Sequence, residues 1–237
     1  MVITTEVCGE VLEKFGMDNV KPVNVPLASY FKLSSDLSPR TNEEKKYMSR
    51  VPYENVVGNL MYAMVSTRPV ISHAIGVVSR FMVNLGEEHW REVKWVLRYL
   101  RGTSDHCISF DGHEGSVSVY ADVDYAGDLD KRRSTTGYVF TRGGHGAISW
   151  MSKLQETVSL STTEAEYISA SDACKEAIWL KGLLDEIGRM QEKVNVLCDN
   201  QCYSFGYKSS LSQQDQAHRC KVSLCETCNR RQQSRSQ

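Results

Sequence analysis

The sequence lacks the features of a membrane-spanning, secreted or strongly charged protein. No stretch approaches the about 18 uninterrupted apolar residues of a membrane-spanning helix, and the N-terminus has no signal-peptide pattern. The formal net charge is only −1, so any contact with a nucleic acid has to come from a local basic patch. We therefore expect a soluble, cytoplasmic protein with no membrane partner.

The composition is that of an ordinary globular protein. Hydrophobic residues make up 41% of the chain and charged residues 24%, a balance that argues against a wholly disordered chain. The length of 237 residues suits one large or two small domains. Because no secretory signal accompanies the eight cysteines, we expect them to be thiols.

The first part of the chain, residues 1–105, is predicted to be mainly helical. A short helix is expected to stop at Gly16, and residues 22–39 form an irregular connection. Apolar residues at helical spacing predict further helices over 55–64 and 88–101, and Gly102 ends the second of these.

A basic stripe runs along the predicted helix 88–101. Its members recur at helical spacing beside the apolar stripe, and they are Arg91, Lys94, Arg98 and Arg101. Two interpretations stay open. The stripe is a solvated face, or it contacts the phosphates of a nucleic acid.

Residues 106–201 predict an α/β domain. Strand patterns cover 116–122, 136–142 and 146–152, and a long amphipathic helix over 162–187 precedes a short apolar strand at 194–198. Antiparallel strands followed by a crossover helix and a strand returning beside the first give a mixed sheet.

Three acidic residues lie on different elements of this pattern. Asp122 ends the first strand, Glu166 lies in the first turns of the long helix, and Asp199 follows the last strand. Carboxylates at these positions can converge on one point, where they repel unless a hard cation such as Mg²⁺ binds them. That arrangement is typical of a two-metal site that cleaves phosphodiesters.

Neighbouring acids are assigned structural roles. Ser161 and Glu164 form a capping box, in which Glu164 reaches back to the amide of Ser161, whereas Glu166 heads the row of the helix that faces the sheet. Asp124 enters a turn, so we favour Asp122 as the metal ligand.

Several segments resemble one known family. Residues 120–128, 133–140, 148–153 and 158–167 are similar to the ribonuclease H domain of copia-type retrotransposon Pol polyproteins, and residues 176–181 and 197–201 extend the match. Residues 57–64 and 95–103, among others, resemble the C-terminal end of the reverse transcriptase of the same polyprotein. The resemblance covers roughly residues 10–201.

The resemblance implies a ribonuclease H-like mixed sheet with a crossover helix, preceded by a reverse-transcriptase thumb-like segment. The implied activity is Mg²⁺-dependent hydrolysis (Mn²⁺ as an alternative) of RNA in an RNA–DNA hybrid, with Asp122, Glu166 and Asp199 as catalytic metal ligands. The implied partners are the hybrid and the rest of the Pol polyprotein. The polymerase's Tyr-x-Asp-Asp hairpin is absent from this chain, so no polymerase activity is expected.

The resemblance stops at about residue 202. Synonymous codons exist for residues 208–220 that, read one base later, spell Asn-Pro-Ala-Phe-His-Ser-Arg-Thr-Lys-His-Ile-Asp, which is the motif expected next in the family. We therefore interpret 202–237 as a disordered, out-of-frame tail that follows a one-base deletion, in place of the family's distal helix and fourth carboxylate. The domain is then a truncated one, 106–201, with impaired hydrolysis. The alternative is a non-catalytic remnant with weak nucleic-acid binding.

The tail also contains residue types that bind zinc. His218, Cys220, Cys225 and Cys228 include a Cys-x-x-Cys step compatible with a zinc ion. Because an out-of-frame product carries no selected ligand geometry, we expect no zinc.

Sequencing the encoding locus tests the frameshift hypothesis. We expect codons over 202–232 that restore the family motif when they are read one base later. An in-frame gene with codons unlike these would contradict the hypothesis.

Overall fold

The structure, a computed structural model, describes residues 2–28, 30–110, 115–143, 146–189, 191, 194–198 and 220–223. The chain divides into two compact units. Unit 1 contains residues 1–108 and 128–132, and unit 2 contains residues 109–127 and 133–237.

Among the described residues of unit 1, all the regular elements are helices. Its helices are α1 (Val2–Lys14), α2 (Asn42–Met48), α3 (Tyr53–Thr67), α4 (Ser72–Val78) and α5 (Glu87–Gly102), with short 3₁₀ turns at Ser35–Leu37, Pro69–Ile71 and Ser79–Phe81. The predicted helices over 55–64 and 88–101 are confirmed, as is the stop at Gly16, whose φ is 63°. In the described part of the chain, no helix combines the length and the apolar character needed to cross a bilayer.

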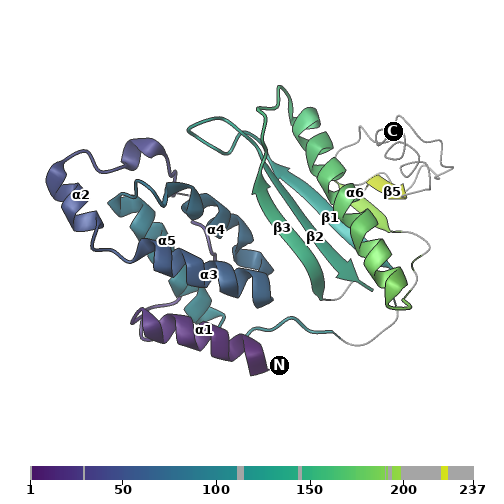
Figure 1. The fold of residues 1–237 in the computed structure, drawn as a ribbon, viewed down its shortest axis with the longest axis horizontal. Helices are drawn as coiled ribbons and strands as arrows, with labels where there is room; N and C mark the ends of the chain where they lie inside the picture. The colour runs from purple at the N-terminus through teal and green to yellow at the C-terminus, as the bar shows by residue number, and fades with distance from the viewer. Residues whose placement is uncertain are drawn as a thin grey trace. The chain divides into compact units, whose positions relative to one another are not determined.

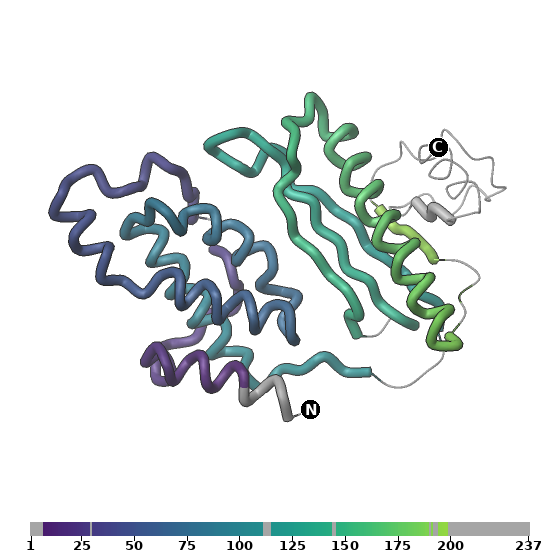
Figure 2. Tube along the Cα trace, viewed as in Figure 1, coloured from purple at the N-terminus to yellow at the C-terminus, as the bar shows by residue number. Residues whose placement is uncertain are grey.

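The core of unit 1 joins elements that are distant in the sequence. Helices α1 and α5 lie side by side (Figure 2), and α3 packs against α1, α4 and α5. Fully buried apolar side chains from α3, α4 and α5 fill the centre, among them Leu60, Val78 and Leu97. The apolar stripe predicted for α5 therefore faces this core.

A histidine holds the start of α5. The amide of Gly86 donates to Nδ1 of His89 over 2.8 Å, and the buried imidazole stacks on Phe81 with ring centroids 4.1 Å apart. A side chain at position 86 would collide with the carbonyl oxygen of Leu37. Burial lowers the pKa of His89, so the ring is neutral near pH 7 and acts as a cap and packing group.

Unit 2 is built on a mixed sheet. Its described strands are β1 (Val117–Asp124), β2 (Thr135–Arg142), β3 (Ala147–Leu154), β4 (Asn195–Cys198) and β5 (Cys220–Ser223), in the order β3-β2-β1-β4-β5. Strand β1 pairs antiparallel with β2 and parallel with β4, and β2 pairs antiparallel with β3. The predicted α/β arrangement with a mixed sheet is confirmed.

Helix α6 (Thr162–Glu186) covers one face of this sheet (Figure 1). The side chains of Val117, Val119 and Ala121 point from β1 into the core, where they meet the α6 residues Ala173, Ala177, Leu180 and Leu184. The helix was expected to reach Ile187, but this residue follows the end of α6 and is 63% exposed.

Part of the tail forms a strand. Cys220–Ser223 pair antiparallel with β4 as β5, so the expectation of disorder over 202–237 is wrong for these four residues. The outer edge of β4 offers backbone donors and acceptors, which pair with an extended segment of almost any sequence. The other residues of 202–237 lie outside the described residues.

A buried glutamine ties α6 to the sheet. Nε2 of Gln155 donates to Oγ1 of Thr136 on β2 over 3.1 Å and to the carbonyl oxygen of Ala165 in the first turn of α6 over 2.9 Å. Its Oε1 accepts from Oγ of Ser159 over 3.1 Å, so all three contacts lie inside unit 2. Because Ala165 precedes Glu166, this network also fixes the backbone position of Glu166 relative to the sheet.

A glutamate is buried in the core of unit 1. Glu92 on α5 is 0% exposed, and neither carboxylate oxygen has a hydrogen-bond partner among the described residues. Burial raises the pKa of Glu92 to about 8. The buried phenol of Tyr53, which donates to the carbonyl oxygen of Val78, has its own pKa raised by burial and by the charge of Glu92.

The stability of unit 1 should fall as the pH rises. The folded state holds the Glu92 proton up to about pH 8, whereas the unfolded state releases it near its usual pKa, so folding stability is lost between these values. The loss amounts to at most about 5 kcal/mol, since one pKa unit corresponds to about 1.4 kcal/mol. Glu92→Gln should flatten the pH dependence of the free energy of unfolding, measured by denaturant titration.

The matched control for this experiment is Glu54→Gln, on the exposed side of α3. In this variant the free energy of unfolding should depend on pH as it does in the wild type. An unchanged slope in Glu92→Gln would contradict the role assigned to the buried carboxyl.

Gln155→Glu should destabilise unit 2. The substitution keeps the size and the acceptor oxygen but removes the amide donors to Thr136 and Ala165, which costs about 1–3 kcal/mol for buried groups left unpaired. Ser159→Ala removes a single hydrogen bond and should cost less. Equal free energies of unfolding for wild type and Gln155→Glu would show that the network does not anchor α6.

Candidate functional site

The N-terminus of α6 has the predicted cap with one difference. Oγ of Ser161 accepts from the amide of Glu164 over 3.1 Å, as expected. The carboxylate of Glu164, however, accepts from the amide of Leu160 over 2.7 Å, one residue before the expected partner. Glu164 thus caps the helix, and its carboxylate is not directed at the sheet.

Glu166 lies on the inner side of α6. It is half-buried, and its Oε2 atom is fully enclosed. One turn further along the helix, Ser169 is 1% exposed, and its hydroxyl donates to the carbonyl oxygen of Asp122 over 2.8 Å. The structure therefore brings the first turns of α6, including Glu166, beside the end of β1.

Asp122 itself is exposed. Alternation along β1 buries Val119 and Ala121 against α6 and directs Tyr120 and Asp122 to the other face of the strand. Oδ1 of Asp122 accepts from the adjacent amide of Val123 over 2.8 Å. The structure thus places the first turns of α6, which carry Glu166, beside the backbone of Asp122, while the convergence of the two carboxylates stays a prediction.

The parallel pairing between β1 and β4 ends at this point. Its last described partners are Ala121 and Cys198, so Asp122 lies one residue beyond the described end of the β1–β4 ladder. On the side of β1 where β4 pairs, no described strand therefore lies beside Asp122. Asp199 is the next residue after Cys198, and it lies outside the described residues.

Asp124 behaves as a turn residue. It closes β1, and its carboxylate occupies the space over Gly127 where a side chain would otherwise extend. Ala126 follows in the left-handed region with a φ of 53°, and its amide donates to Oγ of Ser134 over 3.1 Å. These contacts agree with the structural role predicted for Asp124.

The chemistry of these groups suits a hard cation. Carboxylate oxygens are the preferred ligands of Mg²⁺, and a half-buried glutamate is stabilised by a positive partner. Within the described residues no group of three acidic, histidine or cysteine side chains is arranged to hold a metal ion. The third predicted ligand, Asp199, falls outside that set.

The basic stripe of α5 is largely engaged inside unit 1. Nε of Arg98 and Nε of Arg101 donate to the carbonyl oxygens of Lys21 and Asp18. The guanidinium of Arg91 pairs with Glu87 and Glu88.

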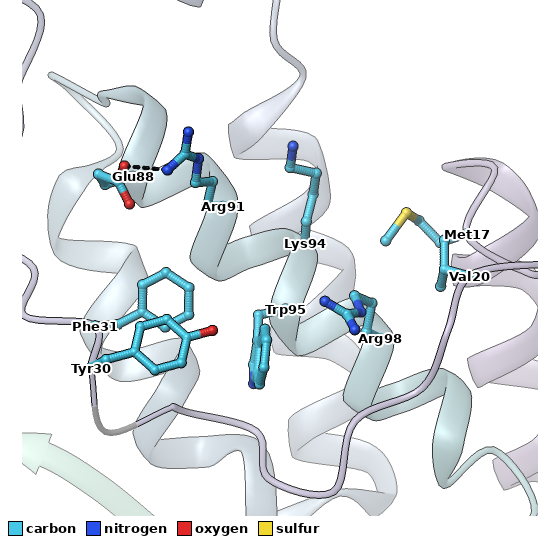
Figure 3. Close-up of a pocket in the computed structure, with 9 residues that line it drawn as sticks. All are labelled: Met17, Val20, Tyr30, Phe31, Glu88, Arg91, Lys94, Trp95 and Arg98. Atoms are coloured by element: carbon cyan, nitrogen blue, oxygen red, sulfur yellow. Dashed lines mark hydrogen bonds and ion pairs between the residues drawn. The ribbon is translucent and has the colours of Figure 1, made fainter.

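Lys94 differs from the three arginines. Its ammonium lies 5.8 Å from the ring centroid of Trp90 and has no hydrogen bond or ion pair among the residues that the structure describes. Figure 3 shows Arg91, Lys94 and Arg98 along one side of the helix. Two of the arginines therefore anchor a neighbouring segment of unit 1, a role that the sequence pattern did not indicate.

Comparisons with known proteins identify relatives over most of the chain. The retrovirus-related Pol polyprotein from transposon TNT 1-94 of Nicotiana tabacum is 58% identical over 191 residues, which are 81% of this chain and 14% of that protein. The polyprotein from transposon RE2 of Arabidopsis thaliana is 38% identical over 193 residues, 81% of this chain and 13% of that protein. The chain thus spans only a small part of these polyproteins.

A shorter relative matches along almost its whole length. Secreted RxLR effector protein 161 of Plasmopara viticola is 47% identical over 135 residues, which are 56% of this chain and 94% of that protein. No protein-family model matches the chain.

Among solved structures, the foamy viral protease-reverse transcriptase in complex with dsDNA aligns with 83% of this chain and 39% of its own. The identity is 14% and the TM-score 0.43, too low to establish a common fold. The sequence identities, by contrast, establish homology: relatives of the chain are retrovirus-related Pol polyproteins from copia-type transposons, and the chain matches a segment of them.

Proposed function

We propose that the chain is the C-terminal end of a reverse transcriptase followed by a ribonuclease H domain. Unit 2 then hydrolyses the RNA strand of an RNA–DNA hybrid with Asp122, Glu166 and Asp199 as ligands of Mg²⁺, or of Mn²⁺ in its place. The observation that carries this proposal is the hydrogen bond between Ser169 and Asp122, which sets the half-buried Glu166 beside the end of β1.

The end of the described β1–β4 ladder explains how ligands on opposite faces of a strand would meet. Asp122 lies beyond the last pair, Ala121 and Cys198, so a side chain from α6 would pass the edge of β1 without crossing a neighbouring described strand. Glu166 approaches from the inner face and Asp122 from the outer face. Asp199 follows β4 in the sequence and would supply the third carboxylate.

The residues of this chain would bind and orient, and the ion would supply the chemistry. Bound divalent cations activate water for attack on the scissile phosphate and stabilise the leaving oxygen. Asp122 and Glu166 hold negative charge where the ion has to be retained. Recognition of RNA would rest on contacts with 2′-hydroxyl groups and on the shape of the hybrid.

Hydrolysis of a hybrid labelled on its RNA strand, with Mg²⁺ present, tests the proposal. We expect metal-dependent cleavage that Asp122→Asn and Glu166→Gln each lower at least about a hundredfold, because each removes a charged ligand. The matched controls are Asp124→Asn and Glu164→Gln, which change carboxylates two positions away. Equal losses in all four variants, or no cleavage by the wild type, would leave a non-catalytic remnant as the function.

Binding of the ion has its own measurement. Mg²⁺ should raise the free energy of unfolding of the wild type by about 1.4 kcal/mol at tenfold excess over its dissociation constant, since it binds only the folded state. Glu166→Gln should abolish this increase, whereas Glu164→Gln should preserve it. An increase of equal size in Glu166→Gln would remove that residue from the metal site.

A further inference from the structure

Unit 1 contains an open pocket lined by aromatic and basic side chains. Its volume is about 510 Å³, within the range of about 300–1,000 Å³ of ligand pockets. Tyr30, Phe31 and Trp95 of α5 form an aromatic group in its lining (Figure 3). The ring centroids of Tyr30 and Phe31 lie 5.7 Å and 5.9 Å from that of Trp95, in edge-to-face arrangements.

Backbone anchors hold the pocket in shape. Nε1 of Trp95 donates to the carbonyl oxygen of Val25 over 2.9 Å, and Nε of Arg98 donates to that of Lys21 over 2.7 Å. These bonds fasten the segment before Tyr30 to α5. The aromatic rings are therefore positioned by the fold, so a ligand that stacks on them does not have to order the segment first.

The ring of Tyr30 is available to a ligand. Its residue is 64% exposed, whereas Trp95 and Phe31 are half-buried beneath it. An exposed aromatic ring supported by two further rings offers a flat apolar surface at the rim of the pocket. Such surfaces stack the faces of planar groups.

The cations of the pocket are unequally engaged. Arg91 pairs with Glu88 over 2.7 Å, and the guanidinium carbon of Arg98 lies 4.9 Å from the centroid of the Trp95 ring. Lys94, between them on the helix, has no hydrogen bond or ion pair among the described residues of the chain. Because Lys94 also lines the pocket, its ammonium is the cation that is left to receive an anion there.

A planar aromatic group joined to an anion would contact both the aromatic rings and the basic side chains of this pocket. We propose that the pocket binds an unpaired nucleotide of a single-stranded nucleic acid, with the base stacked on Tyr30 and a phosphate on Lys94. A base inside a duplex has both faces covered by its neighbours, so it cannot use the ring of Tyr30. The site belongs to unit 1 and is independent of the carboxylates of unit 2.

Fluorescence anisotropy with labelled oligo(dT) and oligo(rU), in the presence of EDTA, tests this site with the full chain. EDTA removes divalent ions, so the outcome does not depend on the metal site proposed in unit 2. We expect both single strands to bind more tightly than a duplex of the same length. The stronger of the two identifies DNA or RNA as the source of the nucleotide.

Two substitutions separate stacking from charge. Tyr30→Ala should weaken single-strand binding about five- to 150-fold, the range of loss for one stacked base. Lys94→Gln should lower the affinity and reduce the salt dependence of log K by about 0.7, as for one phosphate contact on a single strand. Neither side chain is fully buried, so both variants should fold.

The controls match these substitutions in residue type, and the tyrosine pair also matches in exposure. Tyr62 on α3 is also 64% exposed and does not line the pocket, and Lys46 lies on α2. Tyr62→Ala and Lys46→Gln should bind as the wild type does. Wild-type affinity in Tyr30→Ala, or a duplex that binds as tightly as the single strand, would overturn the proposal.

Discussion

The hydrogen bond from Ser169 to the carbonyl oxygen of Asp122 determines how far along β1 the helix α6 is placed. Small alanine side chains at positions 173 and 177 let the helix approach the sheet, but apolar contacts alone permit sliding along the strand. A buried hydroxyl has to keep its partner, because leaving it unpaired costs about 1–3 kcal/mol. The hydrogen bond therefore selects one position of α6 along β1 among several that the apolar contacts would permit. The position of Glu166 relative to β1 follows from it.

Gln155 also fixes the position of α6 relative to the sheet, through a contact with the first turn of the helix. It holds the carbonyl oxygen of Ala165, whereas Ser169 holds the end of β1. Glu166 lies between these two fixed points. These two buried polar contacts therefore fix the backbone from which the half-buried Glu166 side chain extends. That pre-positioning is what a metal site requires of its ligands.

Some of this structure follows from the sequence, and some does not. The 3.6-residue period and the stop residues predict α5, α6 and the end of α1, because long amphipathic helices repeat their pattern several times. Helices α2 and α4 have seven residues each and repeat it hardly at all, and neither was predicted; the capping box of Thr41 and Glu44 at the start of α2 is seen only in the structure. The destination of the Arg98 and Arg101 side chains was not predictable, since their partners are backbone carbonyls of a segment without periodicity.

The candidate site likewise has features that the sequence predicts and features that it does not. Glu164 and Glu166 are separated by helix geometry, and the structure agrees on their different environments. The period of two along a strand also directs Asp122 and Ala121 to opposite faces of the sheet. This difference affects the site only because α6 covers the face of Ala121. Gln155 carried no signal, because a lone glutamine in an irregular segment has the same pattern whether it is buried or solvated.

The strand β5 is compatible with an out-of-frame tail. Its pairing with β4 uses backbone groups, which every residue except proline supplies in full, so the ladder places almost no demand on the side chains. An extended segment that reaches the open edge of β4 pairs there even when its sequence was never selected for the fold. Pairing at positions 220–223 is therefore no evidence for a selected zinc site at His218, Cys220, Cys225 and Cys228, since a metal site depends on side-chain geometry that a backbone ladder does not specify.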